Sequence, residues 1–257
     1  MDTYADWLTA RNCSETTIAH RVRFANRNQH ILTTATDSDL LGILDGYTGW
    51  TRTTYHSALS SYLDWQVSTG ARDDNPLKHP DLVKPRPPRP MPHPLRREDE
   101  SRVLAAASGI VRVLVLLGLR QGLRVHEAVK VRGEDVHEDW LYVNGKGGSF
   151  YRLPTSPEVW VAVAGLPREG WLFPAADGVG HVSAATVNRW VRELFGGLGV
   201  EGNFHRLRAT YGTTLLRNGA TIEVVRRLMR HSSLSSTQHY VDADGDELRA
   251  AVVGLGQ

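Results

Sequence analysis

The chain has 257 residues and a formal net charge of +2, which neither requires nor excludes a polyanionic partner. Hydrophobic residues make up 41% of it and charged residues 23%, a balance that excludes the disordered, collagen-like and membrane classes. The single cysteine, Cys13, excludes an internal disulfide and a thiolate metal cluster, and favours a reducing, cytoplasmic setting.

The first 83 residues predict a small all-helical domain. Ser14 is a good N-cap for a helix that continues to about Leu32. Asp37 or Ser38 is expected to cap a short helix, and Thr51 to open a longer one with apolar residues at helical spacing. The polar face of the first helix is basic, either as an ordinary solvated face or as a contact surface for a polyanion. Its basic residues are His20, Arg21, Arg23 and Arg27.

A proline-rich segment, residues 84–94, separates this region from the rest of the chain and holds six of the twelve prolines. Each proline fixes φ and removes a hydrogen-bond donor, so the segment is expected to be extended and to reach about 30 Å over ten residues. It is either a plain spacer between two domains or a basic strap that carries Lys84, Arg86 and Arg89 along a polyanion.

Residues 95–257 predict a larger domain of mixed α/β structure, which makes the whole chain mainly α with a small β-hairpin. The hairpin is expected at 140–154, where two β-prone runs flank a glycine-rich turn. The tail, 244–257, carries apolar residues at helical spacing. Helices are expected near 97–107, 109–120, 124–131, 156–164, 183–196, 205–217 and 221–229.

Two arginines of this second domain have nearby partners. Arg124 lies in a mostly apolar segment, where a guanidinium must be paired, and Glu127 is three residues away. The pair is either purely structural or presents Arg124 to a ligand. His205 and Arg208 share one edge of a predicted helix, which suits an oxyanion, although a capping histidine beside a surface arginine has the same spacing.

Two further polar segments carry side chains that suit proton transfer or nucleophilic attack. Lys146 lies at the tip of the predicted hairpin, as a solvated turn residue or as a mobile proton donor. His231 and Tyr240 bound the stretch HSSLSSTQHY, in which the tyrosine is either a packing group or a nucleophile.

In chain order, these four segments resemble the motifs of the tyrosine recombinases, the phage-integrase family. GLRVHEAVKVRGEDV is similar to the first arginine box, and GKGGSFYRLP to the β-hairpin lysine segment. HRLRATYGTTLLRNG resembles the His-x-x-Arg box, and LMRHSSLSSTQHY the His box that runs into the nucleophilic tyrosine. The helical first domain resembles the SAM-like core-binding domain of the family more loosely. The chain is similar to short members, which lack an N-terminal arm-binding domain.

The resemblance implies a site-specific DNA recombinase that cleaves and rejoins DNA through a 3′-phosphotyrosine intermediate. Tyr240 would be the nucleophile, and Arg124 and Arg208 would bind the non-bridging oxygens of the scissile phosphate. Such chemistry requires neither a metal nor another cofactor. Lys146 would give a proton to the leaving 5′-oxygen, and His205 would be the general base. His231 would hydrogen-bond the phosphate, and Glu127 would orient Arg124.

Two departures from the family pattern concern DNA contacts. Met229-Arg230-His231 stands where Leu-Gly-His is usual, and we expect Arg230 to contact the DNA backbone or to point to solvent. Arg206 follows His205 where an acidic residue is common, and it is also expected at the DNA. The complete set of expected DNA-binding residues is Arg21, Arg23, Arg27, Arg86, Arg89, Arg206 and Arg230.

The expected partner is double-stranded DNA with specific core sites, bound by a homotetramer when two sites are synapsed and by a monomer or dimer otherwise. Host or phage accessory proteins are further candidate partners, and no membrane partner is expected. The tail, 244–257, is expected to dock either on its own protomer or on a neighbouring one. The resemblance implies either integration and excision of a phage or mobile element, or resolution of DNA dimers. The alternatives are a topoisomerase with the same tyrosine chemistry, a catalytically silent DNA-binding protein and a metal-dependent nuclease.

Overall fold

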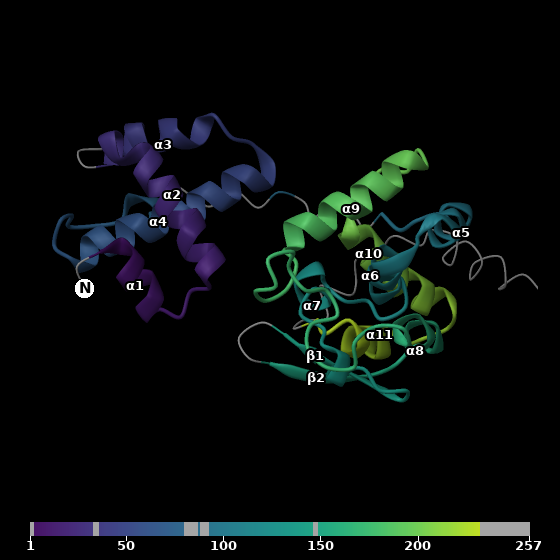
Figure 1. The fold of residues 1–257 in the computed structure, drawn as a ribbon. Helices are drawn as coiled ribbons and strands as arrows, with labels where there is room; N and C mark the ends of the chain where they lie inside the picture. The colour runs from purple at the N-terminus through teal and green to yellow at the C-terminus, as the bar shows by residue number, and fades with distance from the viewer. Residues whose placement is uncertain (1–2, 33–35, 80–86, 88–92, 146–148, 232–257) are drawn as a thin grey trace, which may run out of the picture. The chain divides into compact units, whose positions relative to one another are not determined.

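A computed structural model of the chain describes residues 3–32, 36–79, 87, 93–145 and 149–231 (Figure 1). The chain divides into two compact units, residues 1–89 and 90–257, and the division falls within the proline-rich segment. Among the helices of the described ranges, none combines the length and the apolar character that a membrane span needs. The structure is mainly helical with one small sheet, as the sequence predicted.

The first unit is a cluster of helices around one apolar core, to which Leu8, Phe24, Leu40, Leu59 and Leu63 contribute buried side chains. Two long helices, α2 and α4, pack against each other, and α1 lies against both. The helices are α1 (Tyr4–Ala10), α2 (Glu15–Leu32), α3 (Asp37–Asp45), α4 (Gly49–Ser68) and the short 3-10 helix η1 (Pro76–Lys78).

Side chains cap the starts of α1, α2 and α3 in the first unit, whereas Thr48, before α4, makes no side-chain cap hydrogen bond. Ser14 accepts a hydrogen bond from the amide of Thr17 at 3.3 Å, as expected of the predicted N-cap of α2. The cap predicted for α3 is wrong by one residue, because Thr36 forms a reciprocal capping box with Asp39. Helix α1 was not predicted, although Thr3 caps it through the amide of Asp6.

The second unit contains a two-stranded antiparallel sheet and the remaining helices (Figure 1). The strands, β1 (Trp140–Asn144) and β2 (Phe150–Pro154), pair with Trp140 opposite Pro154, and they confirm the predicted hairpin. The helices are α5 (Arg97–Ala106), α6 (Gly109–Leu119), α7 (Val125–Ala128), η3 (Gly133–Asp135), α8 (Pro157–Val163), α9 (Ala184–Gly197), α10 (Phe204–Arg217) and α11 (Ile222–Leu228).

Helix α7 is much shorter than the predicted segment 124–131. The carbonyl of Val131 accepts a hydrogen bond from the amide of Leu172, and Arg132 forms a β-bridge with Trp171. The amides of Lys130 and Val131 donate to the carbonyls three residues back, those of Glu127 and Ala128, so the α-helix gives way to a tighter turn before the chain reaches these pairings. The N-terminus of α7 is nevertheless fixed at residue 125, directly after Arg124.

Helix α6 is the centre of the second unit, with every side chain from Val113 to Leu119 buried. It packs against α10 at close range, because residue 118 is a glycine. A Cβ atom at Gly118 would lie 2.7 Å from the Cβ atom of Leu207, well inside van der Waals contact. This close approach of the two helices fixes the position of the functional side chains that α10 carries.

Candidate active site

Helix α10 presents His205 and Arg208 one turn apart. Asn203 caps the helix by accepting a hydrogen bond from the amide of His205 at 2.9 Å, and Phe204 and Leu207 are fully buried in the core. These contacts leave the His205 side chain exposed, while Arg208 is directed into the protein, with 1% of its side chain exposed. The predicted shared edge of the helix is therefore present, but only the histidine is open to solvent.

The predicted pair of Arg124 and Glu127 is present at the start of α7. Glu127 accepts from the backbone amide of Arg124 at 2.8 Å and from its guanidinium Nη1 at 2.8 Å. The carboxylate is nearly enclosed, with 7% of the side chain exposed, whereas 44% of the Arg124 side chain is exposed. The pair therefore holds one end of the guanidinium in the protein and leaves the rest accessible to a ligand.

Arg208 is held mainly by backbone carbonyls. Its two terminal nitrogens donate to the carbonyl oxygens of Gly122 and Met229, and Nη1 lies 3.8 Å from the Glu127 carboxylate. Segments around residues 122–127, 205–208 and 229–231 thus meet at one place. The first, third and fourth sequence motifs are brought together here at the residues that the structure describes.

The expectation for Arg230 was wrong, because its side chain is completely buried and neither faces solvent nor is open to DNA. Its Nη2 donates to Glu127 at 2.7 Å and to the Gly122 carbonyl at 2.9 Å, and its Nη1 donates to the Leu228 carbonyl at 2.7 Å. Arg230 also has a φ of +54°, a left-handed conformation that costs a residue with a side chain about 1–2 kcal/mol.

The site carries more positive than negative charge. Burial alone would raise the pKa of Glu127, but the charges and hydrogen bonds of Arg230, Arg124 and Arg208 lower it overall, so the carboxylate is ionised at neutral pH. Three guanidinium groups share this one carboxylate. The resulting excess of positive charge suits an oxyanion such as a phosphodiester.

Both imidazoles are neutral at neutral pH. Burial and the nearby charges of Arg208, Arg124 and Arg230 lower the pKa of His231 to about 4. Desolvation and the first two of these arginines also lower the pKa of His205. A neutral imidazole can accept a proton at one nitrogen and donate a hydrogen bond from the other. These two side chains could therefore act as a base and as a hydrogen-bond donor beside a bound phosphate.

Several expected functional residues lie outside the described part of the chain. Lys146 and Tyr240 are among them, so the structure gives no position for the expected proton donor or nucleophile. The basic linker residues Lys84, Arg86 and Arg89 and the tail 244–257 also lie outside it.

The remaining expected DNA-binding arginines differ in their surroundings. Arg206 is partly buried and donates to the carbonyls of His93 and Pro94, at 3.1 and 3.4 Å, and to that of Glu201. Arg21 is partly buried and donates to Ser61 Oγ at 3.0 Å. Arg23 and Arg27 are exposed on α2, where a polyanion could reach them.

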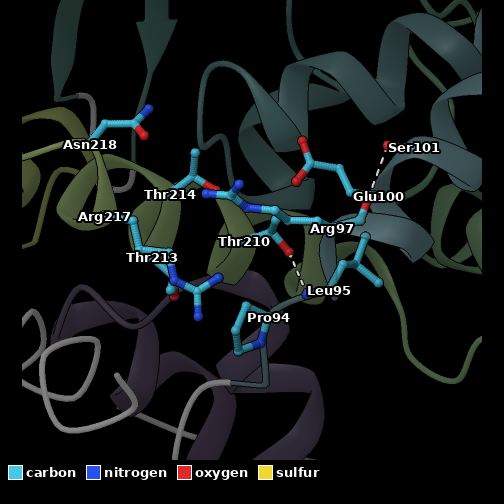
Figure 2. Close-up of a pocket in the computed structure, with 10 residues that line it drawn as sticks. All are labelled: Pro94, Leu95, Arg97, Glu100, Ser101, Thr210, Thr213, Thr214, Arg217 and Asn218. Carbon is cyan, nitrogen blue, oxygen red and sulfur yellow. Dashed lines mark hydrogen bonds between the residues drawn. The ribbon is translucent and has the colours of Figure 1, made fainter. Parts of the chain in front are cut away.

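A pocket of about 320 Å³ lies on another face of α10, between that helix and the start of α5 (Figure 2). Figure 2 shows the hydroxyl of Thr210 beside the backbone amide of Leu95, from which it accepts a hydrogen bond at 2.8 Å. Thr210 is five residues from His205, which places the two side chains about 140° apart around the helix. This pocket is therefore separate from the arginine cluster, and its described lining anchors the beginning of the second unit.

Sequence reasoning missed the carbonyl of Gly122, which accepts from both Arg208 and Arg230. Gly122 has a φ of +58°, and a Cβ atom there would lie 2.3 Å from the ring of Tyr211. The Gln121-Gly122 pair directly after a buried helix was a turn signal that could have drawn attention to this position.

Comparisons with known proteins agree with this arrangement. The Phage integrase family model matches residues 93–247, more than half of the chain. Tyrosine recombinase XerC of Rhodospirillum centenum is 31% identical over 225 residues, which cover 79% of this chain and 65%, just under two thirds, of that protein. The integrase from mycobacterium phage Brujita is 32% identical, with a TM-score of 0.54 over 96% of this chain and 88% of that one.

The fold also resembles more distant solved structures. A lambda integrase dimer bound to a COC′ core site has a TM-score of 0.75, with 17% sequence identity over 94% of this chain and 76% of that one. At this identity the likeness concerns the fold alone. The family match, the Brujita integrase and the arrangement of the motif residues lead to the same conclusion. The chain belongs to the phage integrase family.

Proposed function

We propose that this protein is a site-specific tyrosine recombinase that cleaves and rejoins double-stranded DNA without a metal or other cofactor. The observation that carries the proposal is the cluster around Glu127, where three arginines share one carboxylate beside two neutral imidazoles. The similarity to proteins named tyrosine recombinase XerC and XerD supports the same class of reaction.

The cluster suits the charge that develops during phosphoryl transfer. The phenolic oxygen of Tyr240 attacks the phosphorus, the bond to the 5′-oxygen breaks, and a 3′-phosphotyrosine forms. The exposed part of the Arg124 guanidinium binds a non-bridging oxygen, and neutral His205 takes the phenolic proton. Lys146 gives a proton to the leaving 5′-oxygen. Attack by another 5′-hydroxyl reverses these steps and rejoins the DNA.

The proposed substrate is DNA with specific core sites, and the proposed working assembly is a tetramer on two synapsed sites, formed from monomers or dimers. Structural neighbours described as a lambda integrase dimer on a core site and a tetramer on a Holliday junction support this assembly. Of the expected DNA-binding arginines, the exposed Arg23 and Arg27 suit a backbone contact best. The protein would act on DNA in the cytoplasm of a bacterial or phage-infected cell.

Integration and excision of a phage or mobile element is the first candidate role, because the match to a phage integrase spans 88% of that chain. Resolution of DNA dimers is the second candidate, and the similarity to XerC and XerD proteins supports it. Recombination between two selected sites, on one plasmid and on two, separates these roles. A requirement for two different sites favours integration, and efficient reaction of identical sites favours resolution.

The chemistry is tested on a core site first selected from random DNA by its binding to the protein. A nicked suicide version of this site should form a covalent protein–DNA adduct on a denaturing gel, also in EDTA. Tyr240→Phe should abolish the adduct, whereas Tyr47→Phe, a control in the first unit, should retain it. An adduct formed by Tyr240→Phe would contradict the proposal, and relaxation of plasmids without strand exchange would favour the topoisomerase.

A further inference from the structure

Three unfavourable features coincide at Arg230. Its guanidinium is completely buried, its backbone is in the left-handed conformation, and its Nε has no hydrogen-bond partner among the described residues. Each feature destabilises the fold by itself. Such combinations persist where the surrounding structure holds them in place, and they concentrate at functional sites. The residue is also the direct neighbour of His231 in the sequence.

Arg230 makes two contacts with the surroundings of Arg124. Its side chain binds one oxygen of Glu127, Oε2, while the Arg124 guanidinium binds the other oxygen, Oε1. Its backbone carbonyl also accepts a hydrogen bond from Arg124 Nη2 at 3.3 Å. Loss of the Arg230 side chain would remove one of the two guanidinium groups that hydrogen-bond the carboxylate, one at each oxygen.

Arg230 is also connected to Arg208, through a different group. Both guanidinium groups donate to the same carbonyl oxygen, that of Gly122. The Glu127 oxygen that binds Arg230 at 2.7 Å is also the one that lies 3.8 Å from Arg208. One arginine therefore contacts the supports of both arginines that are expected to bind the phosphate.

We propose that Arg230 is a positioning residue that joins Arg124 and Arg208 into one oxyanion-binding unit, assembled before a phosphate binds. The inference rests on the proposed function, which supplies the phosphate. Arg230 has no exposed surface with which to touch DNA itself, so it acts through Arg124, whose side chain is 44% exposed, and beside the charge of Arg208, whose side chain is 1% exposed. Its charge also contributes to the low pKa of His231, which keeps that imidazole neutral beside the unit.

Arg230→Gly tests the proposal, because glycine adopts a φ of +54° without strain and the variant is therefore expected to fold. At saturating DNA, we expect the single-turnover cleavage rate on the suicide site to fall about 10- to 100-fold, less than the roughly 10²- to 10³-fold for loss of a preorganised donor itself, because Arg230 acts through other groups. The dissociation constant for the DNA should rise only several-fold, by about the same factor as for inorganic phosphate, so that the larger effect lies on the cleavage step. A residue with a merely structural role would lower the amount of active protein without changing the rate of that fraction.

A double-mutant cycle shows whether Arg230 acts through Arg124. In an Arg124→Ala background, Arg230→Gly should slow cleavage less than it does in the wild-type background, because Arg124, one of the two groups that it positions, is already absent. The control is Arg120→Ala, which removes an arginine that donates to Glu100 and Glu158 at 2.6 Å, outside the cluster. Arg120→Ala should have the same effect in both backgrounds. Equal losses from Arg230→Gly in both backgrounds would overturn the proposal.

A second measurement does not depend on DNA cleavage. Inorganic phosphate, titrated into the full-length protein and followed by calorimetry, should bind several-fold more weakly to Arg230→Gly than to the wild-type protein or to Arg120→Ala. An unchanged phosphate affinity would overturn the positioning role even if the wild-type protein cleaves DNA. If the wild-type protein forms no adduct, the proposed recombinase function fails, and weaker phosphate binding by Arg230→Gly would still support the preassembled unit.

Discussion

Replacement of Glu127 by alanine should strongly destabilise the second unit. The carboxylate is the shared partner of Arg124, Arg208 and Arg230, and only 7% of its side chain is exposed. An arginine side chain cannot release its proton in a protein, so the guanidinium groups would stay charged without their counter-ion. The variant therefore creates an uncompensated buried charge.

The size of the effect follows from burial. Removal of one partner from a buried ion pair typically costs about 3–5 kcal/mol of unfolding free energy. We expect a loss in this range, mainly from Arg230 and Arg208, whose side chains are 0% and 1% exposed. The pKa of Glu127 is held below its usual value, so this contribution is present above about pH 4.3 and is lost as the pH falls further.

Hydrogen exchange of the amides of α6 and α10 measures the unfolding free energy of this unit separately from the other one. The control is Glu223→Ala, because Glu223 also binds two arginines, at 2.8 Å, but lies at the surface. Water screens the ion pairs of Glu223, so Glu223→Ala should lower the unfolding free energy much less than Glu127→Ala does. If Glu127→Ala were as stable as Glu223→Ala at neutral pH, the carboxylate would not be the counter-ion of the buried arginines.

Gly122→Ala should destabilise the protein by more than about 1 kcal/mol, because residue 122 is left-handed and an added Cβ would overlap the ring of Tyr211; an unchanged melting temperature would contradict this. Thr210→Val should lower the free energy of unfolding by about 1–3 kcal/mol, measured by thermal unfolding, because the amide of Leu95 loses its acceptor. Thr210→Ser keeps the hydroxyl and should largely retain stability. DNA binding should take up protons between about pH 4 and pH 6.5, because a phosphate anion raises the lowered pKa of His231. Calorimetry in buffers of different ionisation enthalpy measures this uptake, and His231→Gln should reduce it.

Local sequence signals predicted most of the helices and the hairpin. The N-cap at Ser14 and the glycine-rich turn of 140–154 act within a few residues, so the sequence displays them directly. The predicted end of the helix at residue 131 was wrong, because the chain turns after Ala128 and then pairs with Leu172 and Trp171, which are distant in the sequence. Pairings of this kind depend on the folded chain and leave no periodic pattern in a short segment.

The candidate site shows the same division between local and distant information. The pair of Arg124 and Glu127 lies within one turn, and the sequence predicted it from spacing. The burial of Arg230 depends on Glu127, which is 103 residues away, and on the Gly122 carbonyl. In the sequence, Arg230 is simply an arginine beside a polar stretch, so neither its burial nor its partner could be inferred. The catalytic roles expected for Lys146 and Tyr240 stay predictions.

The way in which the arginines are held explains how the site keeps its charge. Arg208 and Arg230 donate to the carbonyl oxygens of Gly122, Met229 and Leu228, and Glu127 is the one carboxylate that pairs with them among the residues described here. A carbonyl orients a guanidinium without cancelling its charge, whereas a second carboxylate would cancel it. Because the groups are oriented before the anion arrives, little reorganisation opposes the binding of charge that builds up on the phosphate. The excess of buried arginines therefore lowers stability at this position and, in the proposed reaction, would stabilise the transition state of phosphoryl transfer.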